Sequence, residues 1–245
     1  MCTLACWIGV FPEAPLVVAA NRDERLGRPA RAPFVWPGAP RIVAPLDEQA
    51  GGTWWALNEH GLFVALTNRA GAMLNAGRRS RGLLVLEVAR SRSLAEAETW
   101  LSRLAADEYN GFHLLASDGS AGVRAVNTGT TLDVARLAPG FHVVTERSFG
   151  ASPTARDERV LELLGTASTL PLDVPGLERV LATHDADPFD SLCVHADAIE
   201  YGTRSSTVLA LGPAIGLLHF APQAPCRSTY VDMSGVLQEL GRSRA

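Results

Sequence analysis

The chain of 245 residues contains no lysine, because all 22 of its basic residues are arginine. A lysine Schiff base and a lysine general base are therefore excluded as catalytic groups. No segment approaches the roughly 18 consecutive apolar residues of a membrane-spanning helix, so we expect no membrane span. The first twenty residues lack a basic start and are interrupted by Glu13 and two prolines. This pattern argues against a secretory signal peptide and predicts a cytoplasmic protein.

Cysteine is scarce, and the sequence has no CxxC motif and no closely spaced cysteine pairs. A disulfide scaffold and a zinc ribbon are therefore not expected, and we predict reduced thiols. The six histidines show no ligand spacing. We interpret His184 and His195, in the loop-like segments HDAD and HAD, as turn residues and predict no metal site. The four cysteines are Cys2, Cys6, Cys193 and Cys226.

The composition is that of an ordinary globular protein, with 47% hydrophobic and 20% charged residues. A net charge of −4 argues against a general nucleic-acid binder. The sequence has no internal repeat and no break in composition, so we expect one domain over residues 1–245 and a small-molecule ligand or substrate.

The segments CTLACWIGV and PLVVAAN are apolar on both alternating faces, which predicts a hairpin covered on both sides. GGTWWALNEHGLFVALTN predicts a second hairpin that turns at residues 58–61, after a surface excursion over 25–45 with a short strand at 34–36. Ser93 and Glu96 form a capping box. The whole pattern favours an α+β fold with stacked sheets inside layers of helices. Further helices are expected at 81–90, 93–106, 153–164, 175–183 and 232–240, strands at 112–116, 122–127 and 141–145, and a late hairpin from STVLAL and LLHF.

Cys2 has two interpretations. It is either a small hydrophobic residue at the start of a buried strand, or a nucleophile exposed by removal of Met1. After that removal, one residue would hold a thiol and a free α-amine with a pKa of about 7.7–8.0. A thiol beside its own base is an activated nucleophile in its most compact form.

Four polar residues, Asn21, Arg22, Asp23 and Glu24, end the second apolar strand. Strand alternation places Asn21 and Asp23 on one face and Arg22 and Glu24 on the other. A short hairpin brings this strand end beside Cys2, where a guanidinium could hold a thiolate or a substrate carboxylate and a carboxylate could orient the α-amine. The alternative is a solvated strand end.

Three other stretches suggest a ligand pocket. Trp54 and Trp55 must point to opposite faces of their strand, so one is expected in the core and the other in the wall of a pocket. Asn68 ends an apolar strand, where its amide could donate to a developing oxyanion or simply belong to a turn. Arg79 and Arg81, in the run from residue 78 to 81 at a helix start, could hold an anion or form a solvated basic turn.

These stretches together resemble the NRDE family, the group of the transport and Golgi organisation protein two. The resemblance rests on MCTL at the start, NRDE, GGTW, LTN at 66–68, RSRG at 79–82 and YGTRSST at 201–207. That family is similar to the cysteine branch of the N-terminal nucleophile (Ntn) hydrolases, which implies a four-layer αββα sandwich. It also implies Cys2 as nucleophile, Asn68 in an oxyanion hole and Arg204 as a late active-site arginine.

Two positions depart from the hydrolase pattern. The hydrolases have Arg-x-x-Asp after the second strand, where this chain offers Asn21 and Glu24 or the adjacent Arg22 and Asp23. An asparagine is expected late in the domain where this chain has Glu146, and a carboxylate there would repel an oxyanion.

Two functions follow from the sequence. The first is an N-terminal cysteine amidohydrolase that cleaves a non-peptide C–N amide bond of a small molecule without a cofactor. The alternative is a non-catalytic cytoplasmic carrier for haem trafficking or for acyl-CoA or lipid binding. In that case haem is the possible cargo, Cys2 could ligate its iron and Trp54 or Trp55 could flank the ring. Glu146 and the altered arginine and aspartate positions favour the carrier.

Overall fold

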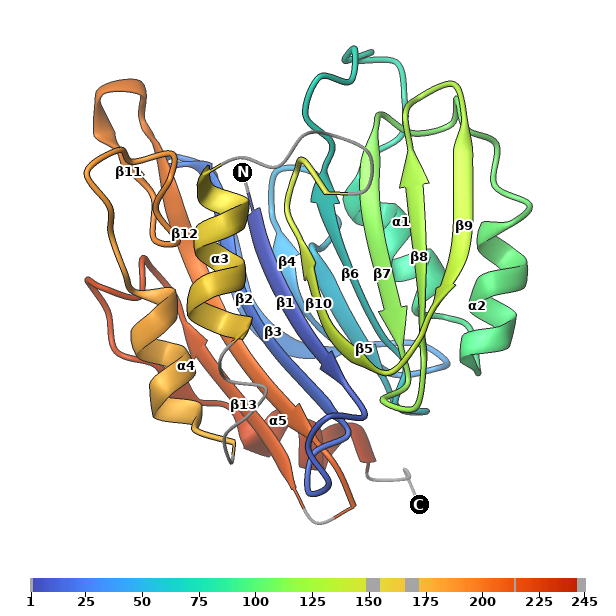
Figure 1. Ribbon diagram of the computed structural model, residues 1–245. Coiled ribbons are helices and arrows are strands. Elements are labelled where there is room, and N and C mark those ends of the chain that lie inside the picture. Colours follow the sequence, from blue (N-terminus) through green and yellow to red (C-terminus); the bar gives the residue numbers. More distant parts are fainter. Residues whose placement is uncertain (1, 149–154, 166–171, 214, 242–245) are drawn as a thin grey trace.

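The computed structural model describes residues 2–148, 155–165, 172–213 and 215–241. These residues form two antiparallel sheets flanked by helices (Figure 1). The first sheet has the strand order β10-β1-β2-β12-β13-β14, with β11 paired to β12, and the second runs from β3 to β9 in sequence order. The strands are β1 (Cys2–Ile8), β2 (Leu16–Arg25), β3 (Ala30–Trp36), β4 (Ile42–Asp47), β5 (Trp55–Asn58), β6 (Phe63–Asn68), β7 (Phe112–Ser117), β8 (Gly122–Asn127), β9 (Leu132–Leu137), β10 (Gly140–Val144), β11 (His195–Ala196), β12 (Tyr201–Leu211), β13 (Gly216–Ala221) and β14 (Val231–Asp232). The helices are α1 (Arg81–Val88), α2 (Leu94–Leu101), α3 (Ala155–Gly165), α4 (Val174–Leu181) and α5 (Ser234–Gly241).

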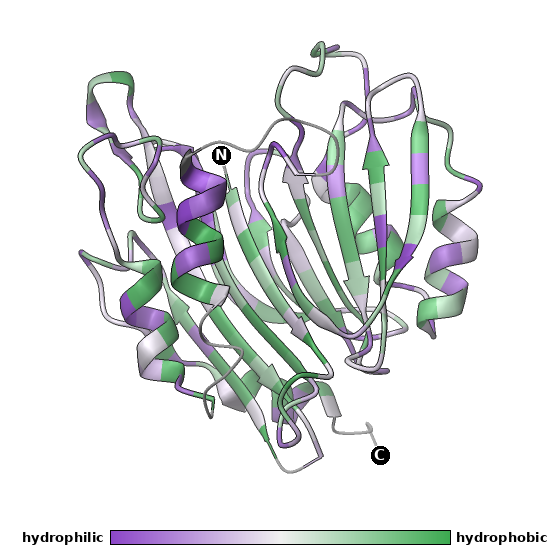
Figure 2. Ribbon diagram, viewed as in Figure 1, coloured by the Kyte–Doolittle hydropathy of each residue, from purple (hydrophilic) through white to green (hydrophobic). Residues whose placement is uncertain are grey.

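Three apolar cores separate four layers. One core joins α1 and α2 to the second sheet, one fills the space between the sheets, and one joins α3 and α4 to the first sheet. Hydrophobic residues accordingly run along the strands, while the hydrophilic ones gather on outer helix faces and in loops (Figure 2). The expected αββα sandwich is confirmed. Among the described residues, no helix is both long enough and apolar enough to cross a membrane.

The first hairpin forms as predicted, with β1 paired to β2 from Cys2–Arg22 to Ile8–Leu16. Leu4 and Cys6 face the core between the sheets, whereas Ala5 and Trp7 face the core under α3 and α4. Both faces of the strand are therefore buried, which explains its continuous apolar sequence.

The stretch over 25–45, expected to be a surface excursion, holds a hairpin made of β3 and β4. The short strand expected at 34–36 is the end of β3, whereas β4 was not expected. Prolines concealed the hairpin, because proline cannot donate to a strand ladder. Pro33 lies where the β3–β4 register is irregular, between Arg31 and Phe34. Pro45 lies beyond Val43, the last residue of β4 that pairs with β5. Both prolines thus avoid positions where a backbone N–H is required.

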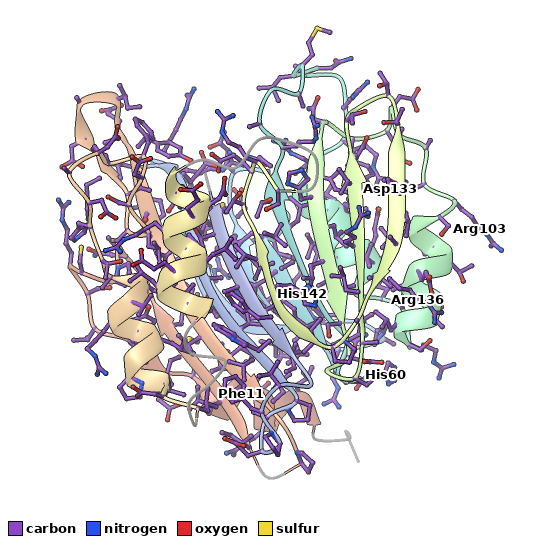
Figure 3. The ribbon with its side chains drawn as sticks, viewed as in Figure 1. Phe11, His60, Arg103, Asp133, Arg136 and His142 are labelled. Atoms are coloured by element: carbon purple, nitrogen blue, oxygen red, sulfur yellow. The ribbon has the colours of Figure 1, made fainter. Side chains whose placement is uncertain are left out.

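The other elements lie near their predicted positions. The hairpin β5–β6, the strands β7, β8 and β10 and the five helices are confirmed within a few residues. The predicted start of the third helix, at residues 153–154, lies outside the described residues. Strand β9 was not predicted, because it lies at the edge of the second sheet with no fully buried residue and so lacks a clear apolar pattern. Its two exposed residues, Asp133 and Arg136, are labelled in Figure 3.

The polar end of β2 fastens the outer helices to the first sheet. The Asn21 amide Nδ2 donates to the carbonyl oxygens of Leu181, at the end of α4, and Leu192, at 2.8 and 2.9 Å. The Asp23 carboxylate pairs with the guanidinium of Arg156 on α3, with Oδ2 and Nη2 2.7 Å apart, and both side chains are almost fully buried. Strand β2 therefore uses one of its faces to hold both helices.

Replacing Arg156 with methionine should destabilise the protein by about 3–5 kcal/mol, because it leaves the buried Asp23 carboxylate without its charged partner. Denaturant titration at neutral pH measures the loss. Arg159→Met is the matched control on the same helix, since Arg159 pairs with Glu162 at the surface and its loss should matter much less. Equal losses in the two variants would contradict a special role for the buried pair.

Candidate functional site

A pocket of about 230 Å³ opens at the N-terminal end of β1. Its walls come from β1, β2, the segment before β5, the end of β6 and the loop that leads into α1. Segments far apart in the sequence therefore meet here. Of the site residues expected from the sequence, those that line this pocket are Cys2, Arg22, Asp23, Glu24, Trp54, Asn68, Arg79 and Arg81.

Cys2 is the first residue of β1 and lies directly across from Arg22 on β2. Its Sγ is 3.8 Å from the carbonyl oxygen of Asp23, to which the thiol donates. The residue is half-buried and borders the pocket. Burial raises the pKa of the Cys2 thiol above its ordinary value, and the Arg22 guanidinium opposes that shift. The thiol therefore needs a base before it can react at neutral pH.

Arg22 is buried beside the thiol. Its guanidinium stacks over Trp54, 4.3 Å from the ring centroid, and Nη2 lies 3.5 Å from the Asp47 carboxylate. Nη1 is buried without a hydrogen-bond partner among the described residues. Burial also lowers the pKa of Arg22. An anion in the pocket would relieve this desolvation and occupy the unused donor.

The two carboxylates near Arg22, those of Glu24 and Asp47, each have an arginine as ion-pair partner. Arg28 pairs with Glu24 at 3.2 Å and with Asp47 at 2.6 Å. Asp47 also accepts from the backbone N–H groups of the turn that follows β4. Glu24 and Asp47 thus belong to one network with Arg22 and Arg28, so they remove little of the positive charge supplied by other arginines.

The loop before α1 supplies that further positive charge. Arg78 donates to the carbonyl oxygens of Tyr109 and Gly129 at 3.1 and 2.9 Å, and Arg81 donates to that of Gly111 at 2.9 Å. Within the described parts of the chain, no carboxylate lies within salt-bridge distance of Arg78 or Arg81. Burial lowers the pKa of Arg81. Two guanidinium groups are therefore fixed at the pocket by neutral acceptors, with no salt-bridge partner among the described residues.

Arg79 differs from its neighbours. Its guanidinium pairs with the carboxylates of Glu87 and Glu108 and stacks over Tyr109, 5.1 Å from the ring centroid. Arg79 thus borders the pocket but already has two carboxylate partners. Of the two arginines expected to hold an anion, Arg81 is the better placed.

A close glycine contact positions Arg81 and Trp54 in one wall. The backbone N–H of Thr53 donates to the carbonyl oxygen of Gly82 at 3.0 Å. A Cβ atom added at Gly52 would lie 2.3 Å from the Gly82 carbonyl carbon, so the two backbones touch only because both residues are glycine. The sequence stretches GGTW and RSRG therefore pack against each other.

The tryptophan pair divides as predicted. Trp55 is buried in the core between the sheets, and its Nε1 donates to the Thr207 hydroxyl at 3.2 Å. Trp54 lines the pocket under Arg22. Asn68, the exposed last residue of β6, borders the same pocket as Cys2. Its side chain is thus in the part of the pocket wall formed by the second sheet.

Two predicted site residues, Asn21 and Arg204, lie outside the pocket lining, and a third, Asp23, borders the pocket without offering its carboxylate. The Asn21 amide binds the helix layer, so Asn21 is turned away from the pocket. The Asp23 carboxylate is fully buried and pairs with Arg156 on the other face of β2. Arg204 lies in a bulge of β12 between Thr203 and Ser205, outside the pocket lining, because the irregular register displaces it from the β2 ladder.

Glu146 is also outside the pocket lining, although it lies near the N-terminal end of β1. It follows two residues after the last β1–β10 pair, Leu4–Val144, on the side of β1 away from β2. Burial raises the pKa of Glu146, and Arg156 opposes the shift. A protonated carboxyl group would donate a hydrogen bond, whereas the ionised form only accepts.

Several residues near the site were not expected from the sequence. Arg156 lies in a charged helix segment, and its buried partner Asp23 is 133 positions earlier in the chain. Arg28 and Asp47 lie in the hairpin region that proline concealed. The cluster of His184, Cys193, His195 and Cys226 was also missed, because the interpretation of the two histidines as turn residues did not anticipate their meeting with cysteines.

Comparisons with solved structures support the same architecture. The chain is similar to an N-acylethanolamine-hydrolyzing acid amidase orthologue from Caenorhabditis elegans, with a TM-score of 0.59 and 12% identity over 92% of this chain and 97% of that one. It is also similar to the C2A mutant of conjugated bile acid hydrolase from Clostridium perfringens, with a TM-score of 0.54 and 15% identity over 100% and 95% of the two chains. At these identities the likeness shows an Ntn-hydrolase fold and no more.

Sequence comparisons identify the family. The family model described as Transport and Golgi organisation 2 matches residues 1–215. The transport and Golgi organization protein 2 homolog of Bos taurus is 32% identical over 228 residues, which cover 79% of this chain and 81% of the relative. The human homolog is 28% identical over the same shares of both chains. The chain therefore belongs to the Transport and Golgi organisation 2 family and has the fold of an Ntn hydrolase.

Proposed function

We propose that this protein is an N-terminal cysteine amidohydrolase that cleaves a C–N amide bond in a small anionic molecule. The observation that carries the proposal is the position of the Cys2 thiol, directly across from the Arg22 guanidinium in a pocket that Asn68 also borders. A nucleophile, a fixed positive charge and an amide donor are the parts that acyl transfer requires.

The reaction starts with removal of Met1, which frees the Cys2 α-amine. The amine takes the thiol proton, and the thiolate attacks the substrate carbonyl carbon. Asn68 donates to the resulting oxyanion. The C–N bond then breaks, the α-ammonium gives its proton to the leaving amine, and a thioester remains on Sγ. Water, deprotonated by the same α-amine, hydrolyses the thioester and restores the thiol.

The pocket favours a small substrate with a negative charge. Its volume of about 230 Å³ lies below the range of about 300–1,000 Å³ that is usual for sites of drug-sized ligands. Arg78 and Arg81 add positive charge without a carboxylate partner among the described residues. A carboxylate or phosphate on the substrate would pair with them.

A non-catalytic carrier of haem or of an acyl thioester is the second candidate. Arg81 would suit a propionate or a phosphate, and buried Glu146 stands where the related hydrolases are expected to have an asparagine. Haem fits less well, because Arg22 already covers the Trp54 ring on which the macrocycle would stack. The hydrolase therefore remains the first proposal.

A chain that begins at Cys2 should hydrolyse members of a panel of small anionic amides. The same chain with Met1 retained should not, because its Cys2 nitrogen is part of a peptide bond and cannot act as a base. Product release is followed by chromatography, and the thioester on Cys2 by intact mass spectrometry. Cys2→Ala should lower turnover about a thousandfold or more. Absence of turnover by the processed chain, together with saturable haem or acyl-CoA binding that Trp54→Ala weakens, would support the carrier instead.

Arg81→Gln should raise KM for an anionic amide about 10- to 100-fold, because it removes one charged hydrogen-bond donor from the pocket. The KM for a neutral substrate of the same shape should change little. Arg79→Gln is the matched control, since Arg79 is already bound to Glu87 and Glu108. Steady-state kinetics on both substrates measure these effects, and an equal rise in KM for the neutral substrate would argue against recognition of charge.

A further inference from the structure

Four metal-ligating side chains converge at the outer side of the first sheet, away from the Cys2 pocket. His184 lies in the turn after α4, Cys193 and His195 enter β11, and Cys226 lies in the turn after β13. One ligand atom from each residue lies within 4.8 Å of the others. The loop after α4, the start of β11 and the turn after β13 therefore meet through two thiols and two imidazoles.

Three of the four ligand atoms lie close to the spacing of tetrahedral ligands around one ion, and all four lie within 4.8 Å of one another. The two Sγ atoms are 3.6 Å apart, and Nε2 of His195 is 3.5 Å from Cys193 Sγ and 3.1 Å from Cys226 Sγ. Zinc bonds of about 2.3 Å to sulfur and 2.0–2.1 Å to nitrogen place tetrahedral neighbours about 3.4–3.8 Å apart. A small inward or outward adjustment of the side chains would therefore centre an ion among them.

The backbone of Cys193 orients the fourth ligand, His184. Nδ1 of His184 lies 3.0 Å from the carbonyl oxygen of Cys193, and the His184 and His195 rings are 4.8 Å apart between centroids. An N–H on Nδ1 donates to that carbonyl, which leaves Nε2 as the electron-pair donor. Zinc-binding histidines commonly have their second nitrogen fixed in this way.

We propose that His184, Cys193, His195 and Cys226 bind one Zn²⁺ ion in a structural site. Two thiolates balance the charge of the ion, and four protein ligands leave no open position for a substrate. A disulfide between Cys193 and Cys226 is the competing state, since both cysteines are free and their sulfurs are near each other. Zinc accounts in addition for the His195 imidazole directed at both sulfurs and for the His184 imidazole, which has a ring nitrogen within 4.8 Å of the other three ligand atoms.

The ion would stabilise the strand that holds Arg22. The Leu192 carbonyl accepts from the Asn21 amide at 2.9 Å, and the Val194 N–H donates to the Thr203 hydroxyl at 2.8 Å. The Thr203 hydroxyl in turn donates to the Asp23 carboxylate at 2.6 Å. The segment that carries Cys193 and His195 is therefore bonded to the face of β2 that lies behind the pocket. Zinc would fix the backing of the Cys2 site without touching the reacting atoms.

The test uses the full chain, kept reduced, with Co²⁺ as a spectroscopic probe and Zn²⁺ as competitor. We expect one equivalent of Co²⁺ to give the d–d bands of a tetrahedral ion and a thiolate-to-cobalt charge-transfer band, and Zn²⁺ to displace it. Protein purified without added metal should contain close to one zinc per chain by elemental analysis. Its melting temperature should fall when a chelator removes the ion.

Cys226→Ser should weaken Co²⁺ binding by more than about a hundredfold, since it removes a ligand rather than an outer partner. His60→Gln and Cys2→Ala are matched controls that should bind Co²⁺ normally. His60 lies in the turn between β5 and β6, at the opposite end of the molecule from β11 (Figures 1 and 3). Absence of stoichiometric binding by reduced wild-type protein would overturn the proposal, as would equal binding by the Cys226→Ser variant; both measurements stand even if a variant folds poorly.

Discussion

The structure around the site depends on one constraint, the burial of three consecutive polar residues, Asn21, Arg22 and Asp23, near the end of β2. Buried charges are costly unless they are paired, so each of these side chains needs a partner on its own face of the sheet. Asp23 finds Arg156 and Asn21 finds carbonyl oxygens of the helix layer, while Arg22 reaches Trp54 and Asp47. A hydrophobic strand end would hold neither the helices nor the pocket wall.

The same alternation gives the two faces of the sheet different tasks. On the outer face, hydrogen bonds link Asp23 through Thr203 to the segment that carries the cysteine–histidine cluster. On the inner face, Arg22 lies across from Cys2, with Arg81 fixed nearby by the contact between Gly52 and Gly82. The hydrogen bonds on the outer face of β2 thus hold the strand in place and so keep Arg22 across from Cys2 on the inner face. They also connect the proposed zinc site to the proposed active site.

Local sequence patterns predicted what is locally determined. Alternation gave the opposite faces of Asn21 and Arg22 and of the tryptophan pair, and apolar runs gave the β1–β2 hairpin. Strands β4 and β9 were missed, and β3 was predicted only at its end, residues 34–36, because prolines and exposed polar residues weaken the strand pattern. Neither the role of Asn21 nor the partner of Asp23 is visible in the sequence, since their contacts are more than 130 positions away. The cysteine–histidine cluster also escaped, because spacing rules detect ligands that are close in sequence.

The central claim is that the Cys2 thiol faces a positively charged pocket, and selective alkylation tests it most directly. Iodoacetate, which is an anion, and iodoacetamide, which is neutral, both react with the thiolate. The rate of iodoacetate divided by that of iodoacetamide at Cys2 is therefore independent of the thiol pKa and reports the local charge. Peptide mass mapping should give a ratio several times that of a short cysteine peptide at low salt, and Arg22→Gln should lower it. A ratio equal to that of the free peptide and unchanged by Arg22→Gln would contradict the account.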